Sequence, residues 1–233
     1  MSNKIVVFSG AGMSAESGIQ TFRDSNGLWE DYNIHDVATP EAWRKNSDLV
    51  NEFYNQRRKQ IIQSQPNSAH YAIVELEKYA DVQIITQNID DLHERAGSSN
   101  VLHLHGNIRY AKSSGPNQEK NYYRINGDEL TIKDLCPEGF RLRPHVVWFG
   151  EDVPMMEKAA CYANESTHFI VIGSSLQVYP AANLVLCCSE KAKKWIIDPK
   201  AEEISSQSGF TRISQNAGDG VSELIKEIIT SFS

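Results

Sequence analysis

The segment Lys4-Ile5-Val6-Val7-Phe8-Ser9-Gly10-Ala11-Gly12-Met13-Ser14 decides the fold class of this 233-residue chain. It joins a short apolar, β-branched run to a glycine turn, a pattern that predicts a buried strand followed directly by a helix. Runs of the same kind recur at residues 82–85, 169–172 and 195–197, separated by stretches of helical period. Because such strands need helices over both faces, we expect an α/β fold: a Rossmann-like parallel sheet with helices on both faces plus a smaller inserted domain.

Two stretches interrupt this alternation. Residues 111–143 are polar and rich in glycine and asparagine, and Asn126-Gly127 suits a tight hairpin turn between residues 122–125 and 130–132. A helical stretch from Pro40 to about Gln63 lies between the first two strand units. We therefore expect a single unit spanning 1–233, with a large domain at about 1–35, 66–110 and 144–233, and a small domain at about 36–65 and 111–143.

Composition narrows the class of partner. Apolar residues make up 40% of the chain, enough for a sizeable core, and the formal net charge is −7. This charge disfavours nucleic acid and anionic membrane as partners, and no stretch approaches the roughly 20 apolar residues of a membrane span. The N-terminus lacks the pattern of a secretory signal, so we expect a cytoplasmic protein with a protein or small-molecule partner, and a monomer as the default state.

Polar or glycine-containing turns follow three of the expected strands. In an open α/β sheet, ligands bind at the carboxyl ends of the strands, so these residues should gather in one crevice. A glycine turn or a simple Asx turn that merely ends a strand is the structural alternative for each. The turn residues are Gly10, Ala11, Gly12 and Ser14, then Gln87, Asn88 and Asp90, then Gly173, Ser174 and Ser175.

Five stretches, in order along the chain, resemble the signatures of the sirtuin family of NAD-dependent protein deacylases. They are the glycine turn with its continuation through Gly18-Ile19-Gln20-Thr21-Phe22-Arg23, then Thr86-Gln87-Asn88-Ile89-Asp90, His105-Gly106, residues 144–151 and residues 173–181. Gln20 departs from the family pattern, which usually has proline there. The resemblance covers nearly the whole chain outside residues 111–143.

The resemblance implies a cofactor, a substrate and a set of residue roles. NAD would bind to the three turns, with Phe22 and Arg23 in the cofactor loop, Gln87 and Asn88 handling ribose and water, and Asp90 holding the nicotinamide carboxamide. Asp198 and Ala217 would complete the nucleotide site. A carboxylate at position 198 accepts ribose hydroxyls and repels a 2′-phosphate, which favours NAD over NADP, although a surface turn residue is the alternative. The acylated lysine of a protein substrate would contact Val146, Trp148, Phe149, Gly150 and Glu151.

His105 and Asn88 would be the catalytic residues. By the same resemblance, nicotinamide leaves the ribose and the acyl-lysine carbonyl oxygen captures the exposed sugar carbon. His105 then takes a proton from a ribose hydroxyl, which an imidazole can do near neutral pH. The products would be free lysine, nicotinamide and O-acyl-ADP-ribose. A lone histidine in a chain with seven of them would otherwise be read as structural.

Tyr54 and Arg57 suggest the acyl preference. They are three residues apart and share one face of the expected helix, which by spacing alone is an ordinary solvated face. With Ala38 upstream, the pattern resembles the class III sirtuins that remove succinyl, malonyl and glutaryl groups. A guanidinium and a phenol can bind an acyl carboxylate, and a small Ala38 leaves room for a longer chain. We expect desuccinylation and demalonylation, with weaker deacetylation.

The cysteines argue against the structural zinc that most sirtuins carry. The chain has four, without a C-x-x-C pair, and only Cys136 falls between His105 and residue 144. One thiolate cannot supply a tetrahedral site, so we expect no metal and reduced structural thiols, with Cys187-Cys188 on a buried helix face.

Three rival functions remain open. An NAD glycohydrolase or ADP-ribosyl transferase would keep Asn88 and His105 but would need no acyl-lysine tunnel. A non-catalytic NAD or ADP-ribose sensor would have no need of His105. A Rossmann dehydrogenase is disfavoured because the glycine fingerprint is incomplete.

Overall fold

A six-stranded parallel sheet forms the centre of the molecule. The computed structural model describes residues 3–20, 28–29, 32–205 and 209–232. Every neighbouring pair in this sheet is parallel, which confirms the expected fold class. In sheet order the strands are β11 (Phe210–Ile213), β10 (Lys193–Ile197), β9 (His168–Ile172), β1 (Lys4–Ser9), β4 (Asp81–Thr86) and β5 (Val101–His103).

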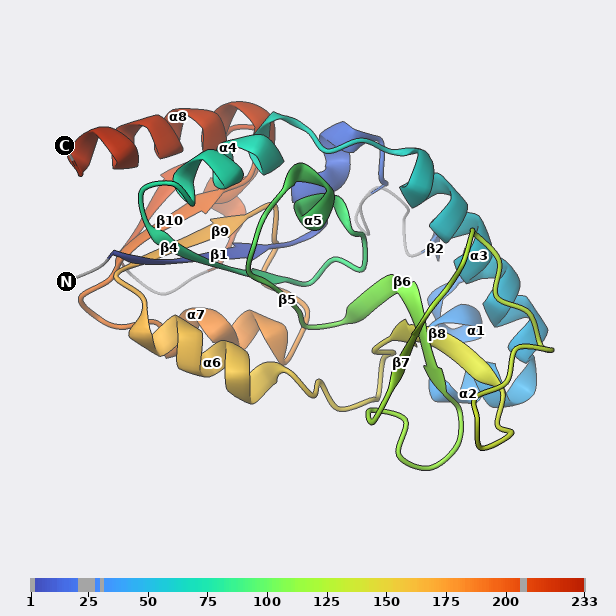
Figure 1. Ribbon diagram of the computed structural model, residues 1–233. Helices are drawn as coiled ribbons and strands as arrows, with labels where there is room; N and C mark the ends of the chain where they lie inside the picture. Colours follow the sequence, from blue (N-terminus) through green and yellow to red (C-terminus); the bar gives the residue numbers. More distant parts are fainter. Residues whose placement is uncertain (1–2, 21–27, 30–31, 206–208, 233) are drawn as a thin grey trace.

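Helices cover both faces of this sheet (Figure 1). Helices α4 (Ser68–Leu76) and α8 (Ala217–Ser231) pack together on one face, and α6 (Met156–Glu165) and α7 (Leu184–Cys187) on the other. Side chains alternate along a strand, so Ile5 and Val7 of β1 join the core under α4 and α8. Val6 and Phe8 point the opposite way, into the core under α6 and α7.

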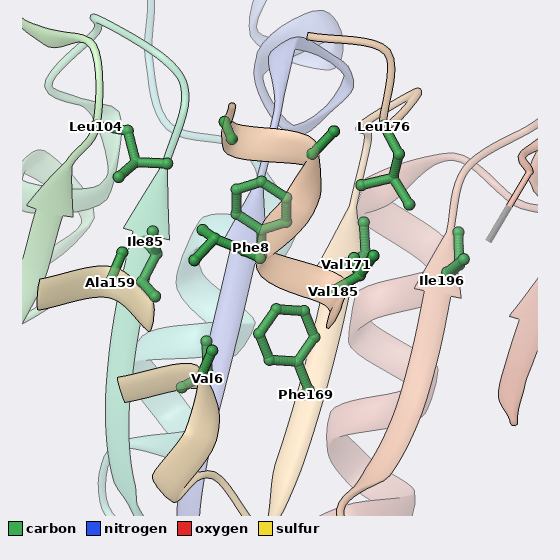
Figure 2. Packing of buried hydrophobic residues seen from close by; sticks show 14 of the residues in the cluster. Val6, Phe8, Ile85, Leu104, Ala159, Phe169, Val171, Leu176, Val185 and Ile196 are labelled. Carbon is green, nitrogen blue, oxygen red and sulfur yellow. The ribbon is translucent and has the colours of Figure 1, made fainter. Parts of the chain in front are cut away.

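The core under α6 and α7 centres on two aromatic rings. Phe8 of β1 and Phe169 of the adjacent β9 have ring centroids 6.2 Å apart, and both side chains are fully buried. Figure 2 shows them among branched side chains of the neighbouring strands, with Ala159 of α6 and Val185 of α7 closing over them. Burial of this kind is the main source of stability, at about 25 cal/mol per Å² of apolar surface.

A second, smaller assembly lies beyond the carboxyl ends of the central strands (Figure 1). It contains an antiparallel sheet of order β7-β6-β8 and three helices. Its elements are β6 (Gly106–Ser113), β7 (Tyr122–Arg124), β8 (Leu142–Val146), α1 (Ile34–Val37), α2 (Pro40–Lys45) and α3 (Ser47–Gln63). The remaining short elements are η1 (Ala11–Ser17), β2 (Leu28–Trp29), β3 (Tyr32–Asn33), α5 (Leu92–Ala96), η2 (Ala181–Asn183) and η3 (Ala201–Glu203).

The expected helix after Pro40 is interrupted once. Thr39 caps α2 by accepting a hydrogen bond from the amide of Ala42, at 3.0 Å. Asn46 ends α2 and begins α3, where its side chain accepts a bond from the amide of Leu49 at 3.1 Å. Asparagine suits this junction because its side chain replaces a backbone acceptor.

The expected hairpin between residues 122–125 and 130–132 is wrong. β7 pairs with β6 instead, with Ala111 opposite Tyr123. The backbone N–H and C=O of Leu130 bond to the side chain of Asn55 on α3, at 2.9 and 3.0 Å, and residues 130–132 form no strand. A side chain from a distant helix therefore satisfies the groups that a hairpin ladder would have used.

The cysteines fit one part of the expectation and contradict another. All four are free thiols, and Cys136 is buried in the small assembly beside Ser113. Cys187 and Cys188 lie at the end of α7 and are only half-buried, because the helix ends there after a single turn. Among the described residues, no helix is long and apolar enough to cross a membrane.

Candidate active site

One cavity collects the sequence-predicted residues. It has a volume of about 580 Å³, and its lining residues come from the turns after the central strands and from helix α3 of the smaller assembly. Pockets of this size suit small molecules and cofactors. Phe22 and Arg23 lie outside the described residues. The predicted residues that line the cavity are Gly10, Ala11, Gly12, Ser14, Ala38, Tyr54, Arg57, Gln87, Asn88, Asp90, His105, Val146, Trp148, Phe149, Gly150, Glu151, Gly173, Ser174, Ser175, Asp198 and Ala217.

Two glycine turns pack against each other to form the floor of this cavity. The amide of Gly12 donates to the carbonyl of Gly173 at 2.9 Å, and Gly173 has a φ of +58°. A Cβ on Gly12 would lie 2.6 Å from the Cα of Gly173, and a Cβ on Gly173 would lie 2.4 Å from backbone atoms of Gly12 and Met13. Only glycine permits this approach. The helix expected after Gly10 is the short 3-10 helix η1.

The turn after β4 is tied to this floor by side chains. The Asn88 amide Nδ2 donates to the Gly10 carbonyl at 3.0 Å and lies 3.2 Å from the Ser14 hydroxyl. That hydroxyl donates to Asp90 Oδ2 at 2.9 Å. Gln87 Nε2 donates to the Ser174 hydroxyl at 2.8 Å. Hydrogen bonds thus join the segments that follow β1, β4 and β9.

Asp90 is a buried carboxyl within this network. Burial raises its pKa, while bonds from the Leu92 amide and from Ser14 favour the ionised form. Such a fixed acceptor at a cavity wall can bind an N–H donor of a ligand.

His105 is held in a single orientation and tautomer. Its Nδ1 lies 3.0 Å from the Gln87 carbonyl oxygen. A carbonyl can only accept, so Nδ1 carries the proton and Nε2 is left as a base. Burial lowers the pKa of His105, against the opposing effect of the Gln87 carbonyl. The imidazole is therefore neutral at pH 7, which is the form a general base needs.

Asp198 and Ala217 form the far wall. Asp198 follows β10 and is 9% exposed, and its Oδ1 accepts a bond from the Lys200 amide at 2.9 Å. Ala217 is the first residue of α8.

Tyr54 and Arg57 of α3 face the cavity from the other side. Tyr54 is fully buried and Arg57 is 3% exposed, so the solvated-face alternative is wrong. The Trp148 indole Nε1 donates to the Tyr54 hydroxyl oxygen at 3.1 Å. An indole N–H can only donate, so the phenol keeps its own O–H for another acceptor. Burial raises the pKa of Tyr54, and the positive charge of Arg57 opposes this increase.

Helix α3 is anchored to the small sheet by a neighbouring arginine. The buried Arg58 guanidinium donates to the carbonyls of Ile108 at 2.7 Å and Asp128 at 3.0 Å. Burial lowers the pKa of Arg58 to about 10, and Arg109 adds to this effect. The position of Tyr54 and Arg57 is therefore set by the small assembly.

The loop after β8 carries the remaining wall. Glu151 accepts two bonds from the Arg143 guanidinium, at 2.6 and 2.8 Å, and one from the Trp148 amide at 2.8 Å. The Arg143 guanidinium carbon also lies 3.4 Å from the centroid of the Trp148 ring. The loop amide of Phe149 donates to the Ala38 carbonyl, at 3.0 Å. These bonds hold Trp148 against Tyr54.

Sequence reasoning did not assign several residues of this site. Arg143 falls at the boundary of the expected insertion, yet it orders the loop through Glu151. Glu16 and Lys200 line the cavity as well, and Glu16 accepts a bond from the Gly218 amide at 2.7 Å. The glycine signature around Glu16 could have drawn attention to it. No local signal marks Arg143, because its partners are defined only by the folded loop.

Fold and site together define a nucleotide-using α/β enzyme whose cavity is lined by both a neutral imidazole and a buried guanidinium. The Sir2 family model matches residues 10–180, which is more than half of the chain. This chain belongs to the Sir2 family.

Similar proteins agree with this assignment. The chain is 47% identical over 230 residues to a Helicobacter pylori protein named NAD-dependent protein deacylase, covering 98% of this chain and 97% of that one. It resembles a solved Sir2 homolog–NAD complex at 37% identity, with a TM-score of 0.85 and coverage of 100% and 91%. A mutant Sir2 homologue bound to ADP-ribose gives a TM-score of 0.87 at 36% identity, with coverage of 99% and 93%.

Proposed function

We propose that this protein uses NAD to remove acidic acyl groups, succinyl and malonyl, from protein lysines, and removes acetyl groups more slowly. The general activity, NAD-dependent protein deacylation, follows from membership of the Sir2 family. The similar Helicobacter pylori protein is named for the same activity. The acyl preference is inferred from the cavity wall.

The residues present fit NAD. The cavity combines a floor of tightly packed glycine turns with hydroxyl, amide and carboxylate groups from Ser174, Asn88 and Asp198. When bound, NAD supplies a ribose carbon from which nicotinamide can leave. The chain's own groups then position the ribose and take a proton from one of its hydroxyls. Asn88 is fixed near Gly10, and His105 offers a neutral Nε2 that can accept a proton from a ribose hydroxyl.

The observation that carries the acyl preference is the burial of Tyr54 and Arg57 in the cavity that also contains His105. A guanidinium that lines a cavity can bind a carboxylate through two parallel hydrogen bonds. Tyr54 adds an O–H donor that Trp148 leaves available. Ala38 lines the same cavity and contributes only a methyl group, which leaves room for an acyl chain longer than acetyl.

The test is a comparison of acyl-lysine peptides of one sequence. Nicotinamide release would be measured with NAD and succinyl-, malonyl- or acetyl-lysine peptide, and without peptide. We expect kcat/KM to be highest for the two acidic acyl groups and release to depend on peptide.

Two substitutions at one position sharpen the test. Arg57→Met should lower the succinyl/acetyl ratio of kcat/KM by at least tenfold, because it removes the cation. Arg57→Lys should give an intermediate ratio, since it keeps the charge but loses the bidentate geometry. An unchanged ratio in Arg57→Met would refute the acyl assignment, and peptide-independent release would favour an NAD glycohydrolase.

A further inference from the structure

His103, the last residue of β5, and His105, two residues further on, donate to consecutive carbonyls of the turn after β4. His105 Nδ1 lies 3.0 Å from the Gln87 oxygen, and His103 Nδ1 lies 3.1 Å from the Asn88 oxygen. Both Nδ1 atoms must donate, since a carbonyl cannot. The two imidazoles therefore hold the peptide units that carry Gln87 and Asn88.

The second nitrogens of these rings face different surroundings. His105 lines the cavity, whereas His103 does not. His103 Nε2 lies 2.7 Å from Glu94 Oε1 on α5, a distance that requires a proton between them. His103 thus bridges a carboxylate on α5 and the backbone of the catalytic turn.

We infer that the His103–Glu94 pair is a positioning device that fixes Asn88 for cleavage of the nicotinamide–ribose bond. Asn88 is held at its amide N–H by the Thr86 hydroxyl at 3.0 Å, at its side chain by Gly10, and at its carbonyl by His103. Without the third contact, the peptide after Asn88 can rotate, and the side chain moves with it. A misplacement of about 1 Å can cost on the order of 100-fold in rate.

The charge state of His103 supports this role. Burial disfavours its charged form, but the Glu94 hydrogen bond and charge outweigh burial and raise the pKa of His103. The pKa of Glu94 is lowered in turn, against the effect of burial. Asp90 also favours the imidazolium.

The other groups near His103 leave this ion pair intact. His93 of α5 and His145 of β8 both have lowered pKa values, chiefly through burial, and are neutral at pH 7. Asn107 Nδ2 of β6 lies 3.2 Å from His103 Nε2 and is uncharged; since both nitrogens are donors in the imidazolium form, this contact is not a hydrogen bond in that form. Because the pKa of His103 is raised, its charged contact is complete below pH 6.5 and is lost as the pH rises through the raised value.

A matched pair of substitutions separates the two halves of the bridge. The amide nitrogen of asparagine takes the place of an imidazole Nδ1, and that of glutamine the place of Nε2. His103→Asn therefore keeps a neutral donor for the Asn88 carbonyl, whereas His103→Gln keeps the contact with Glu94 only. Glu94→Gln keeps His103 and removes its counter-charge.

The measurement is nicotinamide release with the acyl peptide that the wild type uses best. The inference therefore rests on NAD-dependent deacylation and does not depend on the proposed acyl preference. For His103→Gln we expect a fall in kcat of at least tenfold, with KM for the peptide changed by less than about threefold. His103→Asn should retain kcat within about threefold at pH 7 and lose the decline on the alkaline side. Glu94→Gln should move that decline to lower pH.

A purely structural role predicts a different pattern. Both His103 variants would then lower the melting temperature alike and leave kcat per folded molecule equal to that of the wild type. That result would overturn the inference. Equal kcat values for His103→Asn and His103→Gln, or an unchanged pH profile in Glu94→Gln, would also overturn it.

Discussion

Replacing Tyr54 by phenylalanine isolates the contribution of one hydroxyl group to acyl recognition. The ring stays in place, so packing against Phe53, at 4.9 Å between centroids, is retained. What is lost is the O–H that Trp148 leaves free to bind an acyl carboxylate. A hydrogen bond to a charged group contributes about 1.5–3 kcal/mol, which corresponds to a roughly 10- to 150-fold fall in kcat/KM for the succinyl peptide.

The acetyl peptide provides the internal control. It has no carboxylate, so its kcat/KM should change by less than about threefold, and the succinyl/acetyl ratio should fall by the full amount. The Trp148 indole N–H also loses its acceptor, which costs about 1–3 kcal/mol of stability and lowers the melting temperature by roughly 2–12 °C. Assays at a temperature well below unfolding separate the two effects. Equal losses for both peptides would show that Tyr54 does not contact the acyl carboxylate.

Further predictions concern pH, the loop after β8 and metal content. The acid limb of kcat/KM should fall below pH 6.5, because burial lowers the pKa of His105 and activity requires its neutral form; a midpoint above 6.5 would contradict this. Glu151→Gln should cost about 3–5 kcal/mol in urea unfolding, since it leaves the buried Arg143 charge without its carboxylate. Glu165→Gln, at the exposed pair with Lys4, is its matched control and should leave the urea midpoint unchanged, because water screens that pair. Burial lowers the pKa of His70 to about 4, so its stabilising contribution is complete above pH 6.5 and is lost as the pH falls towards 4, on the order of 3 kcal/mol; His70→Asn should flatten this part of the stability curve. Metal analysis should find less than one zinc per chain, with no change in melting temperature on adding a chelator, and one tightly bound zinc would refute the zinc-free assignment.

Strands β1, β4, β9 and β10 could be predicted because their signal is local, and it is clearest in β9, where all five residues are buried. Strand β11, Phe210–Ile213, contains Thr211 and Arg212 and has no continuous apolar run. The hairpin after Ile125 could not be predicted, because the turn signal at Asn126-Gly127 is real but Asn55 occupies the backbone groups of Leu130. A contact between residues 75 positions apart in the chain leaves no trace in a short window of sequence.

The candidate site also has one part that could be predicted from the sequence and one part that could not. The turns at Gly10, Asn88 and Gly173 could be placed together, since parallel strands end at one edge of a sheet. The partners of those residues could not. The Trp148–Tyr54 bond joins residues 94 positions apart, and the bridge from His103 to Glu94 depends on how α5 packs against β5.

The anchoring of α3 has an evolutionary consequence. Tyr54 and Arg57 belong to a helix that Arg58 fastens to β6 and Asn55 to Leu130, whereas the glycine turns follow the central strands. Under the proposed acyl preference, mutations on α3 would change which acyl group is removed without disturbing the residues proposed to bind NAD. A lineage with this architecture can change its acyl specificity one substitution at a time.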